Sequence, residues 1–238
     1  MVNWLRNAAT AEHRAPALEE TPQRAVVSLR EICVQTADGR TLLSIDALDV
    51  CAGDRIVVTG TSGSGKSLLL SVLTGRLPAG LRLAGERRSV VTRIGFVPQR
   101  GSEALHPLTK LGRQLRAVTR TSAQAVAAAL ESVGLGDPAF AGRRPAELSG
   151  GQAQRAAVAL AMLSDAPLVL ADEPTSALDN ETREGVVQLL ADAFAGDRTL
   201  IVTTHDAVVV RALATRHIVV RDGALTELPV THTPALAL

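Results

Sequence analysis

The sequence is poor in aromatic residues. Of its 238 residues only 2% are Phe, Trp or Tyr, and tyrosine is absent. A core must therefore be built from Ala, Val, Leu and Ile, within a total apolar content of 46%. This composition favours a parallel sheet covered by helices over a β-sandwich.

Other absences exclude further classes of protein. The net charge is +1, which indicates neither nucleic acid nor an anionic membrane surface as an electrostatic partner. No apolar run approaches the roughly 18 residues of a membrane span, and the first residues lack the apolar stretch of a signal peptide. The two cysteines, Cys33 and Cys51, have no metal-ligand spacing and are typical of free thiols in a reducing compartment. We expect a cytoplasmic chain, whose membrane role would need a separate subunit.

Apolar patterning predicts an α/β domain. Residues 26–34 and 41–50 alternate imperfectly on either side of Asp38-Gly39, which predicts a hairpin. Short apolar runs predict further strands at residues 55–59, 167–171, 199–203 and 217–220. Helices are expected at residues 67–74, 108–118, 122–133 and 153–163.

The expected helices are not spread evenly along the chain. Residues 101–147 have helical periodicity and no strand signal, with Thr121 or Ser122 as an N-cap and Gly134 as a stop. We therefore expect a helical lobe, at about 101–165, inserted into an α/β domain of residues 25–228. Residues 1–24 are expected to form an N-terminal arm, and residues 229–238 a C-terminal tail.

A glycine-rich loop lies between an expected strand and an expected helix. It reads Gly60-Thr61-Ser62-Gly63-Ser64-Gly65-Lys66-Ser67, and Leu68 follows it as a further candidate binding residue. Glycines allow backbone N–H groups to surround phosphate oxygens, Lys66 supplies a charge, and the Ser67 hydroxyl can hold Mg²⁺. Lys66 is also one of only two lysines in the chain. We call residues 60–67 the phosphate loop, and the alternative of a flexible glycine turn is disfavoured by this context.

Polar residues follow other expected strands, where the ligands of open α/β sheets bind. Asp172 ends one apolar run and can reach the Mg²⁺ shell, while the next residue, Glu173, can accept a proton from an attacking water. His205 follows another run, which favours a γ-phosphate contact over the structural role that a lone histidine usually has. Gln99, at the junction with the helical lobe, could sense water or metal.

A second glycine loop reads Leu148-Ser149-Gly150-Gly151-Gln152. Ser149 can cap a helix beginning near Gln152 or Ala153, and the helix N-terminus attracts negative charge. These residues alone are compatible with an ordinary capped helix start or with a second phosphate cradle. We call residues 148–152 the second glycine loop.

These motifs, in this order and spacing, resemble the ATP-binding subunits of ABC transporters over about residues 26–225. The resemblance implies a P-loop NTPase fold with a mostly parallel sheet, an N-terminal antiparallel β portion and an inserted α-helical lobe. It implies an ATPase that uses ATP and Mg²⁺ at the cytoplasmic face of the cell membrane. Implied partners are a second copy or a paralogous ATPase in a head-to-tail dimer, membrane permease subunits and a solute-binding protein, without nucleic acid.

The resemblance also implies residue roles. Ser149, Gly150, Gly151 and Gln152 would close over the ATP held by the other chain's phosphate loop, and Asp179 would lie in a loop that crosses the dimer interface. Lys66 and Ser67 would hold phosphates and Mg²⁺, with Gln99 and Asp172 in the metal shell. Glu173 would be the general base and His205 the switch histidine, and Gln99 would also couple the site to the lobe.

A finer resemblance is to the uptake branch for peptides, nickel and metallophores. Its pointers are Ala104-Leu105-His106-Pro107, Val133-Gly134-Leu135 and Ala171-Asp172-Glu173-Pro174-Thr175. One departure is Thr36, which takes the place of the aromatic that usually stacks on adenine, so we expect weaker base selectivity. The alternatives are a non-transport ABC ATPase acting on DNA or ribosomes and a nucleotide-gated interaction module with little catalysis. Near-neutral charge, the uninterrupted lobe and the intact catalytic set count against them.

Overall fold

A computed structural model describes residues 24–230, apart from residues 177, 195 and 197. The strands are β1 (Ala25–Thr36), β2 (Thr41–Cys51), β3 (Arg55–Thr59), β4 (Leu81–Ser89), β5 (Ile94–Val97), β6 (Leu168–Asp172), β7 (Thr199–Thr204), β8 (Arg216–Arg221) and β9 (Ala224–Leu228). The α-helices are α1 (Lys66–Thr74), α2 (Leu111–Thr119), α3 (Ala123–Ser132), α4 (Ala139–Gly142), α5 (Gly150–Leu163), α6 (Asn180–Ala193) and α7 (Ala207–Leu213). Residues 1–23 of the expected arm and 231–238 of the expected tail lie outside the described residues.

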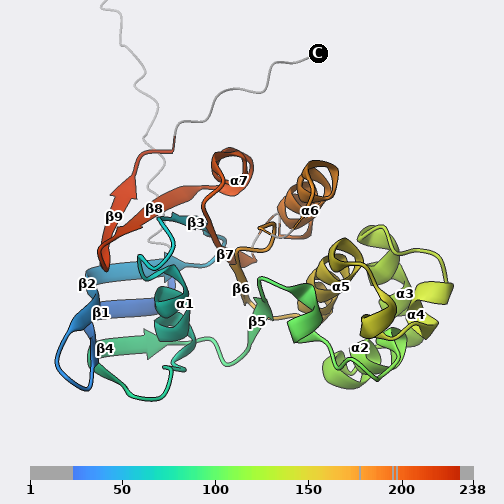
Figure 1. Ribbon diagram of the computed structural model, residues 1–238, viewed down its shortest axis with the longest axis horizontal. Coiled ribbons are helices and arrows are strands. Elements are labelled where there is room, and N and C mark those ends of the chain that lie inside the picture. Colours follow the sequence, from blue (N-terminus) through green and yellow to red (C-terminus); the bar gives the residue numbers. More distant parts are fainter. Residues whose placement is uncertain (1–23, 177, 195, 197, 231–238) are drawn as a thin grey trace, which may run out of the picture.

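The described strands form one mixed sheet with the order β4-β1-β2-β9-β8-β3-β7-β6-β5 (Figure 1). The pairs β1–β2 and β1–β4 are antiparallel, whereas β8, β3, β7, β6 and β5 are parallel neighbours. The expected fold class is thus confirmed, including its antiparallel N-terminal portion. Parallel pairing places the carboxyl ends of β3, β6 and β7 at one edge of the sheet, where a ligand can be reached from several strands.

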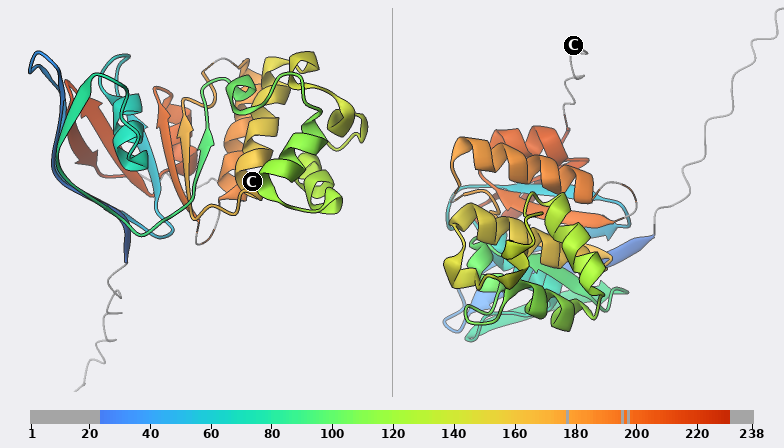
Figure 2. Two further views of the ribbon diagram at one scale, coloured as in Figure 1. Left: turned by 90° about the horizontal axis from the view of Figure 1, so that it is seen from below. Right: turned by 90° about the vertical axis from the view of Figure 1, so that its right-hand side faces the viewer.

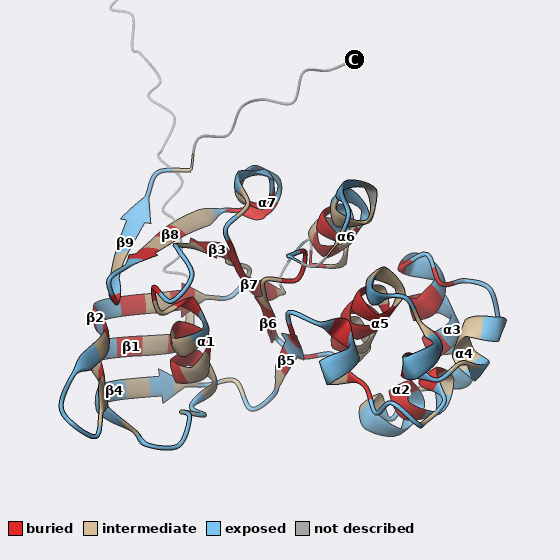
Figure 3. Cartoon of the chain, in the orientation of Figure 1, coloured by how far each residue is buried: buried red, intermediate tan, exposed pale blue. Residues whose placement is uncertain are grey.

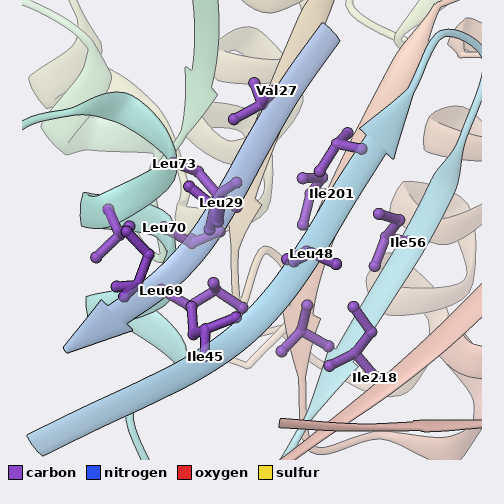
Figure 4. Packing of buried hydrophobic residues seen from close by; sticks show 14 of the residues in the cluster. Val27, Leu29, Ile45, Leu48, Ile56, Leu69, Leu70, Leu73, Ile201 and Ile218 are labelled. Carbon is purple, nitrogen blue, oxygen red and sulfur yellow. The ribbon is translucent and has the colours of Figure 1, made fainter. Parts of the chain in front are cut away.

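Aliphatic side chains fill both faces of the sheet. Helix α1 packs on one face, with Leu69, Leu70 and Leu73 against side chains of β1 and β2 (Figure 4). On the other face, β6 and β7 pack against α5, α6 and α7, around the fully buried Phe194. Strands β6 and β7 are buried almost throughout (Figure 3), as their continuous apolar runs predict.

Helices α2, α3, α4 and α5 gather at one end of the molecule (Figure 2). Leu111, Leu115, Leu130 and Leu135 form a buried cluster here with Ala156 and Ala159 of α5. Helix α5 also packs with α6 and β6, so it belongs to two hydrophobic clusters. Among the described residues, no helix is both long and apolar enough to cross a membrane.

Two helix starts differ from the sequence-based expectation. Helix α2 begins at Leu111 and not at Leu108, which is 72% exposed. The Gln114 side chain binds the backbone of His106 and Thr109 and holds the preceding residues in a turn. Helix α5 begins at Gly150, ahead of the expected Gln152 or Ala153, because the Ser149 hydroxyl accepts the Gln152 N–H and Gln152 Oε1 accepts the Ser149 N–H.

Candidate functional site

A cavity of about 660 Å³ opens at the carboxyl ends of β3, β6 and β7. Most predicted site residues line it, contributed by the phosphate loop and by the segments that follow three different strands. These are Ser62, Gly63, Gly65, Lys66, Ser67, Leu68, Gln99, Asp172, Glu173 and His205. We call this space the phosphate-loop cavity.

Lys66 is the buried cation of this cavity, with 5% of its surface exposed. Its Nζ donates to the backbone oxygens of Gly60 (2.9 Å) and Thr61 (3.1 Å). The same nitrogen lies 3.2 Å from Glu173 Oε1. Because a buried charge is costly without partners, these contacts hold the ammonium group at one position beside the start of α1.

The phosphate loop depends on glycine at its ends. A Cβ on Gly60 would lie 2.3 Å from the Val220 carbonyl oxygen, and Gly60 has φ of +156°. Gly65, the N-cap of α1, has φ of +114°. Ser64 Oγ is buried beside Gly60 without a hydrogen-bond partner among the described residues. Gly60, Thr61 and Ser64 therefore shape the loop and do not themselves line the cavity.

Glu173 is fixed from both ends. Its backbone has φ of +43°, and its N–H donates to the Thr203 carbonyl oxygen at 3.0 Å and to Thr203 Oγ1 at 2.9 Å. Its carboxylate lies between Lys66 and His205, whose Nδ1 is 3.0 Å from Oε2. A left-handed backbone outside glycine is uncommon and is found where surrounding contacts enforce it. Strand β7 thus sets the direction of the Glu173 side chain through Thr203.

Oxygen donors suited to Mg²⁺ line the same cavity. Asp172 receives the Thr203 hydroxyl at Oδ1 (2.5 Å), and Gln99 donates its amide N–H to Ser176 Oγ (3.0 Å), which leaves the amide oxygen of Gln99 as an acceptor. Ser67 adds a hydroxyl. Within the described ranges no cluster of three His, Cys, Asp or Glu side chains could hold a metal. This donor set fits Mg²⁺, which is usually bound through one or two carboxylates together with substrate phosphates.

The second glycine loop does not line the phosphate-loop cavity. Ser149 caps α5, and a Cβ on Gly151 would lie 2.6 Å from Thr182 Cγ2 of α6. A Cβ on Gly150 would have nothing within 4 Å. Asp179, the remaining candidate, caps α6 by accepting the Thr182 N–H at 2.9 Å. Ser149 to Gln152 and Asp179 are therefore separate from the other candidates within one chain.

Thr36 also lies outside this cavity. Its hydroxyl accepts the Arg40 N–H at 3.1 Å and donates to the Asp38 carboxylate, which keeps the pKa of Asp38 below its usual range. Leu42 of β2 lines the cavity instead. Sequence reasoning missed Leu42, because a leucine in an alternating strand carries no signal of a binding site.

Comparisons with known proteins point to one family. The profile of the ABC transporter family matches residues 43–176. A macrolide export ATP-binding/permease protein MacB of Paracoccus denitrificans is 38% identical over 219 residues, which cover 82% of this chain and 31% of that protein. The zinc import ATP-binding protein ZnuC of Cereibacter sphaeroides is 38% identical over 177 residues, 74% of this chain and 71% of that protein. The chain thus spans about a third of the MacB relative.

Solved structures give the same picture. The dimeric ATP-binding cassette MJ0796 bound to ADP and Pi has a TM-score of 0.72 and 28% identity, covering 86% of this chain and 99% of that chain. A metal-chelate type ABC transporter in an inward-facing conformation has a TM-score of 0.69 and 27% identity, covering 87% of this chain and 84% of that chain. Together with the family match, these results identify the chain as a member of the ABC transporter family and as one of its ATPase cassettes.

Proposed function

We propose that this chain binds and hydrolyses Mg·ATP to energise solute transport through separate membrane permease subunits. The observation that carries the proposal is the convergence of Lys66, Ser67, Asp172 and Glu173 on one cavity. The phosphate loop and the start of α1 would bind the phosphates through backbone N–H groups and the Lys66 charge. Ser67, Asp172 and Gln99 would hold Mg²⁺, which neutralises phosphate charge when bound.

Glu173 is the proposed general base. Its carboxylate can accept the proton of a water that attacks the γ-phosphate, because Thr203 directs it into the cavity. His205 contacts the same carboxylate and would orient it, while also reaching the γ-phosphate from the exposed side. Phosphate oxygens would compete with Glu173 for Lys66, so nucleotide binding would free the carboxylate for catalysis.

The separation of the second glycine loop supports a head-to-tail dimer. Gly150 is exposed, and the chain's own packing gives no reason for glycine at this position. A helix N-terminus free of its own cavity can bind the phosphates held by another copy or by a paralogous ATPase. Asp179, at the start of the neighbouring α6, would lie along the same interface.

The variant Glu173→Gln tests this mechanism. We expect its hydrolysis rate to fall by about 10² to 10⁴-fold, as for loss of a general base. ATP binding should persist, and the variant should accumulate as an ATP-bound dimer in size-exclusion chromatography. Glu184→Gln, an exposed change on α6, is the matched control and should hydrolyse like the wild type. A Glu173→Gln enzyme with near wild-type turnover would contradict the assigned role.

A groove in the helical lobe is the surface at which we expect a permease subunit to dock. It has about 750 Å³ between α2, α3 and α4, with an apolar floor that includes Ala117 and Val126. Four cations surround the floor and have no ion pair among the described residues: Lys110, Arg113, Arg116 and Arg120. This pattern fits an amphipathic segment with acidic side chains, which we assign to the cytoplasmic side of a permease subunit. The chain would then work at the cytoplasmic membrane face.

Charge reversal tests the docking surface. We expect Arg113→Glu/Arg116→Glu to abolish co-purification with the permease subunits encoded by neighbouring genes, because the groove would repel an acidic segment. ATP hydrolysis by the chain alone should not change, since the groove is separate from the phosphate-loop cavity. Co-purification at the wild-type level would show that the permease binds elsewhere.

For the solute we propose import of a peptide, nickel or metal chelate, delivered by a solute-binding protein. The motifs of the uptake branch support this assignment, as does the likeness to a metal-chelate type transporter. A second candidate, export, is favoured by the identity to MacB relatives. Solute uptake into vesicles that contain the reconstituted complex separates the two: accumulation that depends on a solute-binding protein requires import.

A further inference from the structure

The N-terminal end of α5 is joined to the segment that carries Gln99. Gln154 is only 2% exposed, and its amide nitrogen donates to the Pro98 carbonyl oxygen at 3.2 Å. Three residues beyond Pro98, a Cβ on Gly101 would lie 2.3 Å from the Ala153 carbonyl oxygen. The two backbones are thus in direct contact, and the hydrogen bond from the Gln154 side chain to Pro98 is shielded from water.

Each end of this connection belongs to a different part of the proposed machinery. On one side, Gln99 lines the phosphate-loop cavity. On the other, the same end of α5 carries the second glycine loop, held as a unit by the mutual hydrogen bonds of Ser149 and Gln152. A displacement of Pro98 and Gln99 would therefore displace Ser149 as well.

The start of α5 is also in contact with the start of α6. Gly151 packs against Thr182, and Thr182 donates its hydroxyl to Asp179 at 2.8 Å. The loop before Asp179 contains Ser176, which accepts the hydrogen bond from Gln99. The segment that carries Gln99 is thus connected to the second glycine loop by two routes. One runs through the buried Gln154 side chain, and the other runs through Ser176, Asp179 and Thr182.

We propose that Gln154 is a positioning residue that couples nucleotide occupancy of the phosphate-loop cavity to the placement of the second glycine loop. This inference rests on the proposed function and names a regulation of that site. Because coupling between two sites is reciprocal, nucleotide bound at the second glycine loop would also alter Gln99. The two ATP sites of a head-to-tail dimer would communicate through this hydrogen bond.

The alternative is that Gln154 only stabilises the fold. Gln154→Met removes the amide at nearly constant length, and Gln114→Met is the matched control. Gln114 is likewise nearly buried, and its hydrogen bonds go to the backbone of the same lobe at His106 and Thr109. A purely structural role predicts that both variants lower Tm and leave nucleotide-dependent behaviour unchanged.

The test is hydrogen exchange of the amides of residues 149–153 at a protein concentration where the chain is monomeric, with and without a non-hydrolysable Mg·ATP analogue. In the monomer no partner chain holds nucleotide against the second glycine loop. Any effect of the analogue on these amides must therefore be transmitted from the phosphate-loop cavity of the same chain. We expect the analogue to slow their exchange by about fivefold in the wild type and in Gln114→Met. A fivefold change corresponds to the lower end of typical coupling free energies between two sites. In Gln154→Met the change should disappear while analogue affinity stays within about twofold.

Steady-state kinetics give a second readout. We expect Gln154→Met to lower kcat by about tenfold with a much smaller change in KM for ATP, whereas Gln114→Met keeps both. Unchanged exchange on adding analogue to the wild type, or an intact response in Gln154→Met, would overturn the coupling while leaving the proposed function untouched. Failure of the wild type to bind the analogue would instead overturn the proposed function, and the coupling with it.

Discussion

The two glycine-rich loops of this chain look alike in sequence and differ in construction. The phosphate loop contains a buried cation, glycines with left-handed backbone and a Cβ position blocked by the backbone of β8. The second glycine loop has no charged side chain, no glycine with positive φ and an ordinary capping box. The first brings a cation, backbone N–H groups and oxygen donors to one cavity within a single chain. The second is a helix start that can contribute to a site whose other parts lie elsewhere.

The largest expected effect is on the phosphate loop. Lys66→Met should weaken ATP binding to the monomer by about 100-fold, because it removes a charge-assisted contact to phosphate from a buried position. Isothermal titration calorimetry measures this change. Lys110→Met, at the only other lysine, should bind ATP like the wild type, and equal losses in the two variants would refute a special role for Lys66.

Next in size is a change in folding stability at the second glycine loop. Gly151→Ala should cost about 2 kcal/mol, since its Cβ would overlap the Thr182 methyl group. Adding Thr182→Ser removes that methyl and retains the hydroxyl bound to Asp179, so the double variant should recover most of the loss in urea unfolding. If turnover stays low after stability returns, Gly151 also has a role at the partner's nucleotide. Failure to recover stability would contradict the packing explanation.

A smaller effect separates binding from turnover. Ser149→Ala should lower stability by about 1 kcal/mol through the lost N-cap, and turnover about tenfold, while monomer affinity for ATP is unchanged. Ser122→Ala removes an equivalent cap from α3, where the hydroxyl accepts the Ala125 N–H at 3.1 Å. It should match the stability loss and keep turnover. Equal turnover losses in both variants would mean that capping alone explains Ser149.

The smallest effect concerns the base. Among the described residues no aromatic side chain lines the phosphate-loop cavity, and Leu42 offers only aliphatic contact. A missing aromatic contact is worth about 0.5–1.5 kcal/mol, so the dissociation constants of ATP and GTP should differ by less than about tenfold. The chain's single tryptophan, Trp4, lies outside the described residues. Trp4→Leu should leave this ratio unchanged, and a strong ATP preference lost in Trp4→Leu would contradict the assignment.

The sequence predicts most of what surrounds the cavity because those residues carry strong local signals. Strands β6 and β7 are continuous apolar runs that end in polar residues, and Ser122 and Ser149 both cap helices in the structure. Gly134 also ends its segment with a left-handed backbone, at φ of +71°. Once these strands pair in parallel, their carboxyl ends lie at the same edge of the sheet, so the sequence signals of the single strands suffice to predict the cavity.

Other elements have weak local signals. Strand β4 is mostly exposed and rich in arginine, and it forms by pairing with β1 at the edge of the sheet. The pairing contains a bulge at which Glu31 has φ of +50°. A Cβ on Gly85 would clash there with the Glu31 carbonyl oxygen. Leu42 in the cavity and the bond from Gln154 to Pro98 depend on contacts between distant segments. Residue spacing along one segment does not encode them.

The most direct test of the two-loop comparison is a mixing experiment with two impaired variants. Lys66→Met impairs the phosphate loop and Ser149→Ala impairs the second glycine loop. In a head-to-tail dimer with one copy of each variant, one of the two ATP sites is therefore built from two intact halves. We predict that mixing the variants yields ATPase activity well above the mean of the two measured separately, up to about a quarter of the wild-type rate for random pairing. No gain on mixing would contradict the claim that the two loops serve different ATP sites.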